Sequence, residues 1–154
     1  MSGKYETRLA ELGVTLPDAP APAANYVPYV VVGDMVYVSG QISGDANGRI
    51  NGKLGDDFTV EQGQAAAKTC AISLIAQVKS ACGGDLDRLV QVVKLGGFVN
   101  CTPDFADHPA VINGASDFIG EVFGDAGKHA RAAVGSSSLP LGVAVEIEGI
   151  FQIK

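Results

Sequence analysis

Tryptophan is absent from this chain of 154 residues, histidine occurs only twice, and no run of lysine and arginine stands out. The 11 basic residues are outnumbered by 17 acidic ones, which gives a formal net charge of −6. A nucleic-acid surface needs clustered basic side chains to neutralise phosphates. The composition therefore disfavours electrostatic binding to nucleic acid.

Long apolar runs are also missing, since none approaches the roughly 20 residues that a membrane-spanning helix requires. The first residues, MSGKYETRLAELG, are charged and amphipathic and lack the apolar core of a signal peptide. Cys70, Cys82 and Cys101 are odd in number and have no CxxC spacing. We expect a cytoplasmic protein with reduced thiols, no membrane association and no Cys/His zinc site. Cys101, at the start of a loop, is the candidate for an exposed thiol.

The residues that are present favour one globular domain over 1–154, because 47% are hydrophobic and 18% charged. Residues 4–12 are expected to form a short amphipathic helix that ends at Gly13. The proline-rich stretch LPDAPAPAAN follows as an extended connector, so residues 1–22 form an N-terminal helix and connector.

A hairpin is predicted next by YVPYVVVGDMVYVSGQI, in which two β-rich runs flank Gly33 and Asp34. Pro28 indicates that the first run starts at, or lies on, an edge of the sheet. Residues 43–57 are rich in glycine, asparagine and aspartate and predict a loop, with a small ribbon near Arg49.

Two longer helices and three further strands complete the chain. Thr59 and Gln62 match the capping box S/T-x-x-E/Q, which predicts a helix over about 60–81. LVQVVKLGGFV predicts a strand whose paired glycines, Gly96-Gly97, mark a bulge or a close backbone approach. Pro109 opens a second helix, and HARAAVGSS and GVAVEIEGIF predict the last two strands.

This order of elements predicts an α+β fold, in which two helices cover one face of a mixed, mainly antiparallel sheet. The other face must then meet solvent or another copy of the chain. In the last strand Val145 and Ile147 alternate with Glu146 and Glu148. Both carboxylates are therefore expected on the uncovered face.

Several motifs occur in a characteristic order. The hairpin ends in Ser39-Gly40-Gln41, FVNCTPDF follows the middle strand, and AVINGASDFIGEVFG carries Asn113. The ending ARAAVGSSSLPLGVAVEIEGI contains R-x-x-V, then L-P, then V-E-I-E. The set resembles the Rid family of reactive-intermediate imine deaminases, also called YjgF-like and, in an older name, endoribonuclease L-PSP. The resemblance covers roughly residues 23–153. The added N-terminal helix is similar to the family's longer YjgF/chorismate-mutase-like branch.

The resemblance implies a chorismate-mutase-like fold and a trimer whose sheets form a central barrel, with three active sites in clefts between subunits. It implies that Arg131 is the site arginine and Glu146 the site glutamate. It also implies four substrate-lining positions and one asparagine, which fall on Tyr26, Ser39, Gly40, Ala133 and Asn113. Many family members carry a cysteine where this chain has Ala133, and the family also uses that residue's backbone.

The reaction implied by the resemblance is hydrolysis of an imine, formed from an enamine such as 2-aminoacrylate, to a 2-keto acid and ammonia. A guanidinium matches a carboxylate with two parallel donors, which suits Arg131 to anchor such a substrate. Glu146 is suited to activate water or relay a proton. Tyr26 would wall the pocket, and Asn113 is expected to cap or bridge at a subunit contact. The reaction requires no metal or organic cofactor.

Other interpretations of the same residues remain open. Arg131 is also compatible with a surface arginine, since arginines are mostly exposed. Glu146 is compatible with a solvated face or a structural ion pair with Arg131. The alternative function is a non-catalytic trimer that binds small carboxylates or keto acids. An endoribonuclease is disfavoured by the acidic charge, and a chorismate mutase would rest on fold analogy alone.

Overall fold

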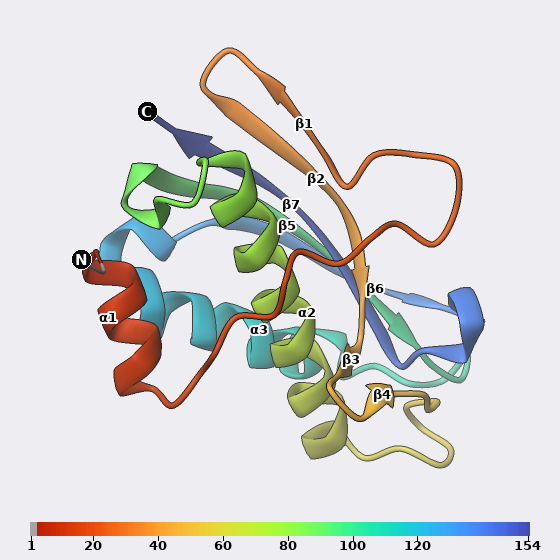
Figure 1. The fold of residues 1–154 in the computed structure, drawn as a ribbon. Coiled ribbons are helices and arrows are strands. Elements are labelled where there is room, and N and C mark those ends of the chain that lie inside the picture. Colours follow the sequence, from red (N-terminus) through yellow and green to blue (C-terminus); the bar gives the residue numbers. More distant parts are fainter. Residues whose placement is uncertain (1–2) are drawn as a thin grey trace.

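The computed structural model describes residues 3–154, which build one five-stranded sheet with the strand order β1-β2-β7-β5-β6 (Figure 1). Neighbouring strands are antiparallel, except for the parallel pair of β5 and β6. The strands are β1 (Tyr29–Val32), β2 (Met35–Ile42), β5 (Leu89–Asn100), β6 (Ala130–Ser136) and β7 (Val145–Ile153). A separate small ribbon pairs β3 (Gly44–Asp45) with β4 (Gly48–Arg49). The predicted mixed, mainly antiparallel sheet and the ribbon are confirmed.

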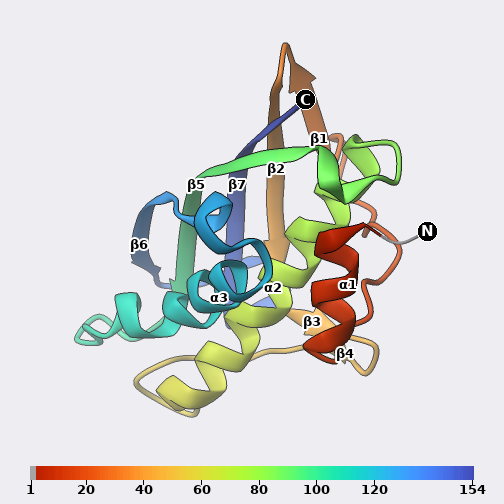
Figure 2. The same ribbon diagram turned by 90° about the vertical axis from the view of Figure 1, so that its left-hand side faces the viewer.

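The helices α1 (Lys4–Glu11), α2 (Val60–Ala81) and α3 (His108–Phe123) all lie on one side of this sheet (Figures 1 and 2). The predicted α+β architecture, with two long helices on one face and a third at the N-terminus, is therefore confirmed. Among residues 3–154, no helix has both the length and the apolar character needed to cross a membrane.

The capping box at the start of α2 forms as predicted. The Thr59 hydroxyl accepts a hydrogen bond from the Gln62 backbone N–H at 3.1 Å, and Gln62 Oε1 accepts one from the Thr59 N–H at 2.8 Å. These bonds satisfy two of the donors that every helix start leaves free. The helix then buries small side chains, including Ala67 and Ala71, which let it lie close against the sheet.

The glycine pair in β5 marks a close approach rather than a bulge. A Cβ atom built on Gly97 would lie 2.7 Å from the Ile112 side chain of α3. The irregularities in the pairing of β5 with β7 lie earlier in the strand, between Leu89 and Lys94. The second helix begins one residue earlier than predicted, at His108, with Pro109 in its first turn.

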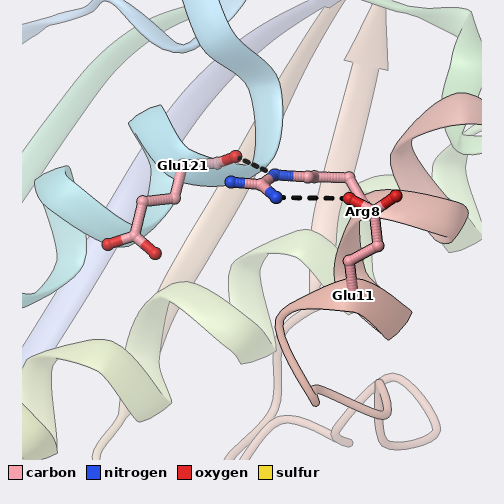
Figure 3. A network of polar contacts seen from close by, with 3 residues as sticks. All are labelled: Arg8, Glu11 and Glu121. Carbon is pink, nitrogen blue, oxygen red and sulfur yellow. Dashed lines mark hydrogen bonds and ion pairs between the residues drawn. The ribbon is translucent and has the colours of Figure 1, made fainter.

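The N-terminal helix is held against the end of α3. Arg8 Nε donates to the carbonyl of Glu121 at 2.9 Å, and Arg8 Nη1 pairs with Glu11 at 3.2 Å (Figure 3). The rings of Tyr5 and Phe123 meet edge to face, with centroids 4.8 Å apart. Arg8 thus satisfies one of the carbonyls that the last turn of a helix leaves without a partner.

One face of the sheet has no helix over it (Figures 1 and 2). In β7, Val145 and Ile147 are fully buried under the helices, whereas Glu148 is exposed and Glu146 half-buried. The predicted alternation of this strand is therefore confirmed. Large apolar side chains such as Val134 are also exposed, and Val134 shares a cross-strand row with Glu146.

The expectation of an exposed thiol at Cys101 is wrong. Its side chain is buried, and its sulfur lies 3.4 Å from His108 Nε2. The backbone of Cys101 bridges to Leu54, so the loop after β4 folds back over the end of β5. Nothing in the local sequence pattern indicated this long-range pairing.

Candidate active site

A β-bulge positions the Ser39-Gly40 pair. Val38 pairs with Gly149 and Gln41 pairs with Ile147, so β2 has one residue more than β7 between these points. The Ser39 hydroxyl donates to the carbonyl of Val27 at 2.8 Å, which ties the bulge to the segment before β1. The bulge therefore forms where the sequence turns from a β-rich run to Ser-Gly.

Gly40 makes room for the predicted glutamate. A Cβ atom at this position would overlap the carboxylate of Glu146, because that side chain lies directly against the glycine backbone. Any larger residue would push the carboxylate away. The absence of a side chain at Gly40 is thus required by its contact with Glu146 rather than by its backbone angles.

Three of the predicted substrate-lining residues meet in one small recess of about 80 Å³. Tyr26, Ser39 and Gly40 line it together with the connector residues 20–23. Tyr26 is 48% exposed, so this lining residue is also in contact with solvent. The structure therefore brings these three residues together, whereas Glu146, which contacts Gly40, and Arg131 do not line the recess.

The environment of Glu146 alters its acidity. Burial raises the pKa of this carboxyl, and the negative charge of Glu148 on the same face raises it further. Both causes act by disfavouring the charged form. A carboxyl that titrates nearer to neutral pH is better matched to accept and return a proton.

Arg131 is held by uncharged groups of α3. Its Nη1 donates to Asn113 Oδ1 at 2.8 Å and to Ser116 Oγ at 3.1 Å, and its Nη2 donates to the carbonyl of Pro109 at 3.3 Å. These bonds use three of the five guanidinium N–H groups. The Nε–H and one Nη2–H are left, and within residues 3–154 Arg131 forms no ion pair.

Ser116 is itself oriented by His129. His129 Nδ1 lies 2.6 Å from the carbonyl of Gly127, which can only accept, so Nδ1 carries the proton. In the neutral ring Nε2 then accepts, and the Ser116 hydroxyl donates to it at 2.8 Å. This arrangement leaves the oxygen of Ser116 free to accept from Arg131.

Arg131 and Glu146 lie on opposite sides of the sheet within one chain. Arg131 pairs with the buried Leu95 and turns toward α3, on the covered side. Glu146 pairs with Phe98 and turns to the open face. The interpretation of these two residues as a structural ion pair within the chain is therefore wrong. Ala133 is two residues along β6 from Arg131, so it shares the covered side.

Two buried glutamines were missed by the sequence analysis. Gln77 Nε2 donates to the carbonyl of Pro20 at 2.7 Å and to Gln41 Oε1 at 3.4 Å. Gln41 Nε2 in turn donates to the carbonyl of Ser39 at 2.9 Å. This network joins α2, the connector and the bulge. A signal existed, because Gln77 interrupts the apolar stripe of α2 next to Val78.

Comparison with known proteins identifies the family of the chain. The family model described as "YjgF/chorismate_mutase-like, putative endoribonuclease" matches residues 6–148. The chain belongs to this family. The match begins within α1, upstream of the residues on which the sequence resemblance rests.

The most informative relatives differ in what their names convey. Protein TCP17 of Trypanosoma cruzi is 48% identical over 99% of this chain and 96% of its own length. A 2-iminobutanoate/2-iminopropanoate deaminase of Dermatophagoides farinae is 33% identical over 92% of this chain and 95% of its own. The crystal structure of Atu1372 from Agrobacterium tumefaciens, a protein of unknown function, has a TM-score of 0.91 and 47% identity. That likeness covers 97% of this chain and 92% of the other. The YjgF-type, chorismate-mutase-like fold is thereby established.

Proposed function

We propose that this protein hydrolyses 2-imino acids to 2-keto acids and ammonium, at a site shared between two copies of the chain. In the protonated form the reaction is R–C(=NH2⁺)–COO⁻ + H2O → R–CO–COO⁻ + NH4⁺. Water adds to the imine carbon, one C–O bond forms, and the C–N bond breaks as ammonia leaves with the proton. The named activity of the Dermatophagoides relative supports this choice within the family.

The observation that carries the proposal is the state of Arg131. Its positive charge is not neutralised by any carboxylate of residues 3–154, and two of its N–H groups stay open. Three neutral acceptors hold the guanidinium in place, so little side-chain entropy is lost when an anion binds. A carboxylate next to an electrophilic carbon is a ligand that this fork suits.

Glu146 supplies the proton transfers in this proposal. Its carboxylate accepts a proton from the attacking water and returns it to the departing nitrogen. The raised pKa favours both halves of that cycle, because the group accepts and releases protons at a pH nearer to neutrality. Ser39 and Gly40 would line the substrate, with Tyr26 at the entrance.

Opposite placement of the two charged residues requires a second copy. Arg131 and Ala133 of one protomer must meet Glu146, Gly40 and Tyr26 of another for all to contact one substrate. We propose the cyclic trimer of the family, in which the open faces of three sheets pack into a barrel. Three chains of 15.8 kDa give about 47 kDa. A monomer in light scattering would rule out a site shared between subunits.

Ala133 takes the place of the cysteine found in many family members. Its side chain offers only a methyl group, so any polar contact at this position comes from the backbone of β6. The proposed hydrolysis does not use a thiol, because water is the nucleophile and Glu146 the base. We therefore propose that Ala133 lines the substrate without taking part in proton transfer.

The test is an assay in which an amino-acid oxidase generates 2-imino acids and semicarbazide reports the imine that remains. Wild type should speed the loss of imine, whereas Glu146→Gln and Arg131→Ala should not. If wild type has no effect with any amino acid but still binds 2-keto acids, hydrolysis is wrong. The protein would then be a carboxylate-binding trimer, the second candidate that Arg131 supports.

A further inference from the structure

A second and larger cavity lies beside the recess, with a volume of about 640 Å³. It is bordered by residues of the N-terminal connector, of α2, of the end of β2 and of the ribbon of β3 and β4. Its apolar lining comes from Leu16, Pro17, Pro20, Ile42 and Ile72, and Thr15, Ser43, Asp45, Arg49, Thr69 and Ser73 also line it. Its size lies in the range of small-molecule sites.

The cavity and the recess have walls in common. Pro20, Ile42 and Ser73 line both of them. The recess and the larger cavity therefore adjoin each other at these three residues. With a volume of about 80 Å³, the recess has room for the carboxylate and imine carbon of a substrate, here called its head, but not for a long side chain.

The Ser43 and Thr69 hydroxyls of the larger cavity are satisfied within the chain, whereas Thr15, Asp45 and Arg49, which also line it, are exposed to solvent. The Ser43 hydroxyl donates to the carbonyl of Ile50 at 2.8 Å and accepts from Val145 N–H at 3.3 Å. The Thr69 hydroxyl donates to Ala66 at 2.6 Å and accepts from Gly44 N–H at 3.0 Å. They make no demand for a polar ligand, so an apolar group can fill this space without leaving a buried donor unpaired.

Ser73 lies on the shared wall of the two spaces. The residue is 9% exposed and lines both of them. A serine in mid-helix usually bonds its own preceding turn or reaches solvent. Here it lies at the point where the polar head of a ligand would give way to its side chain.

We propose that this cavity is a side-chain subsite, which selects 2-imino and 2-oxo acids with branched aliphatic or aromatic side chains. The inference rests on the proposed function for the head of the ligand and adds the substrate class. The reacting carbon lies at the Ser39-Gly40 bulge, and the side chain runs past Ile42 into the space between Leu16 and Ile72. The connector, which precedes all the proposed site residues in the sequence, then helps to determine which substrates bind.

The experiment compares two ligands and two protein variants by calorimetry. Pyruvate carries only a methyl group, whereas 4-methyl-2-oxopentanoate adds three carbons, and each methylene in a fitted pocket changes selection by roughly tenfold or more. Wild type should bind the longer acid at least tenfold more tightly. Ile72→Trp fills the cavity and should abolish that preference while leaving pyruvate affinity unchanged. Ala65→Trp, on an exposed part of α2 that lines neither space, is the matched control.

Leu16→Ala provides a second variant, since it changes only the connector and should also reduce the preference. Equal affinity of wild type for both acids, or a preference that survives both variants, overturns the subsite.

If the preference exists and Ile72→Trp removes it, yet no imine is hydrolysed, the subsite stands and the proposed reaction fails. If imines are hydrolysed with no preference for longer side chains, the reaction stands and the subsite fails. Absence of binding by either acid overturns the subsite as well.

Discussion

Arg131 and Asn113 are joined by a hydrogen bond of 2.8 Å from Nη1 to Oδ1, which links the edge strand β6 to α3. Because the amide is neutral, it fixes the guanidinium without cancelling its charge. Asn113 was expected to cap or bridge at a subunit contact. Its observed role in the chain is to orient Arg131, and a subunit contact stays a prediction.

Replacing Arg131 tests whether this charge is kept for a ligand. Arg131→Ala should weaken 2-keto acid binding roughly 10- to 150-fold, the equivalent of one charge-assisted hydrogen bond of about 1.5–3 kcal/mol. Arg131→Lys should recover only part of the affinity, since a lysine offers a point charge and no fork. Calorimetry with pyruvate measures both effects.

The control is Lys128→Ala, which removes an equal charge close by in sequence. The Lys128 side chain is 82% exposed, and its one ion pair among residues 3–154 is with Asp125 at the surface. Its loss should leave affinity within about twofold. If Lys128→Ala weakens binding as much as Arg131→Ala does, the effect reflects net charge, and the anchoring role of Arg131 is refuted.

Glu146→Gln should separate turnover from binding. The amide matches the carboxylate in size but cannot accept a proton from water, so imine hydrolysis should fall about 100-fold or more. Affinity for a 2-keto acid should change much less, because Arg131 supplies the anchor. Glu148→Gln on the same open face should keep most of the activity. If Glu148→Gln loses activity and Glu146→Gln keeps it, Glu146 is not the base.

The pH dependence of activity should reflect the raised pKa of Glu146. The ionised carboxylate is the active base. The value of kcat/KM should therefore fall as pH drops through the raised pKa of Glu146, which lies above the ordinary glutamate value of 4.5. Since the charge of Glu148 contributes to the shift, Glu148→Gln should move this acid limb to lower pH. A limb that stays in place in Glu148→Gln contradicts the coupling.

The same shift has a consequence for stability with a defined sign. A carboxyl whose pKa is higher in the folded than in the unfolded state stabilises the fold below the unfolded pKa, and this contribution is lost as pH rises through the folded pKa. Glu146→Gln should therefore be at least as stable as wild type at pH 7. That advantage should disappear toward pH 4, as measured by urea unfolding.

The fold was predictable because its local signals agree with one another. The capping box at Thr59, the turn at Gly33 and the alternation around Glu146 each depend on residues close in the chain, and each is confirmed. The burial of Cys101 was not predictable in this way. It depends on a pairing with Leu54, almost fifty residues upstream, for which no periodic pattern exists.

The sequence predicts which residues belong to the candidate site but not how they are arranged. The motifs indicated Arg131 and Glu146, yet alternation within β6 and β7 does not say how the two strands align across β5. Only the register, Leu95 with Arg131 and Phe98 with Glu146, shows that they face opposite sides. The recess could not be inferred either, because part of its lining comes from a connector with no regular structure.

Gly40→Ala tests the contact with Glu146. The added Cβ would overlap the carboxylate, which lies at the end of a flexible side chain and can move aside. Activity should therefore fall at least tenfold, while the melting temperature stays within a few degrees of wild type. In the Glu146→Gln background Gly40→Ala should have little further effect, since both changes disable one group. Additive losses in that double variant would mean that Gly40 acts independently of Glu146. Gly120→Ala, where a new Cβ meets no atom within 4 Å, is the control.

Gln77→Leu tests the network that holds the connector on α2. The substitution removes the hydrogen bonds to the Pro20 carbonyl and to Gln41, in a fully buried position. Leaving such acceptors without donors costs about 1–3 kcal/mol of unfolding free energy. It should also release the connector, so that proteases cut residues 17–23 under native conditions much faster than in wild type.

Gln64→Leu is the matched control on the same helix. Gln64 Nε2 donates to the carbonyl of Ala110 at 2.9 Å, so this variant loosens α3 instead of the connector. It should lower stability without speeding cleavage at 17–23. If both variants expose the connector equally, the effect follows from global unfolding, and Gln77 has no special hold on it. If only Gln77→Leu does, then affinity for 4-methyl-2-oxopentanoate should fall with it, because the connector contributes Leu16, Pro17 and Pro20 to the lining of the larger cavity.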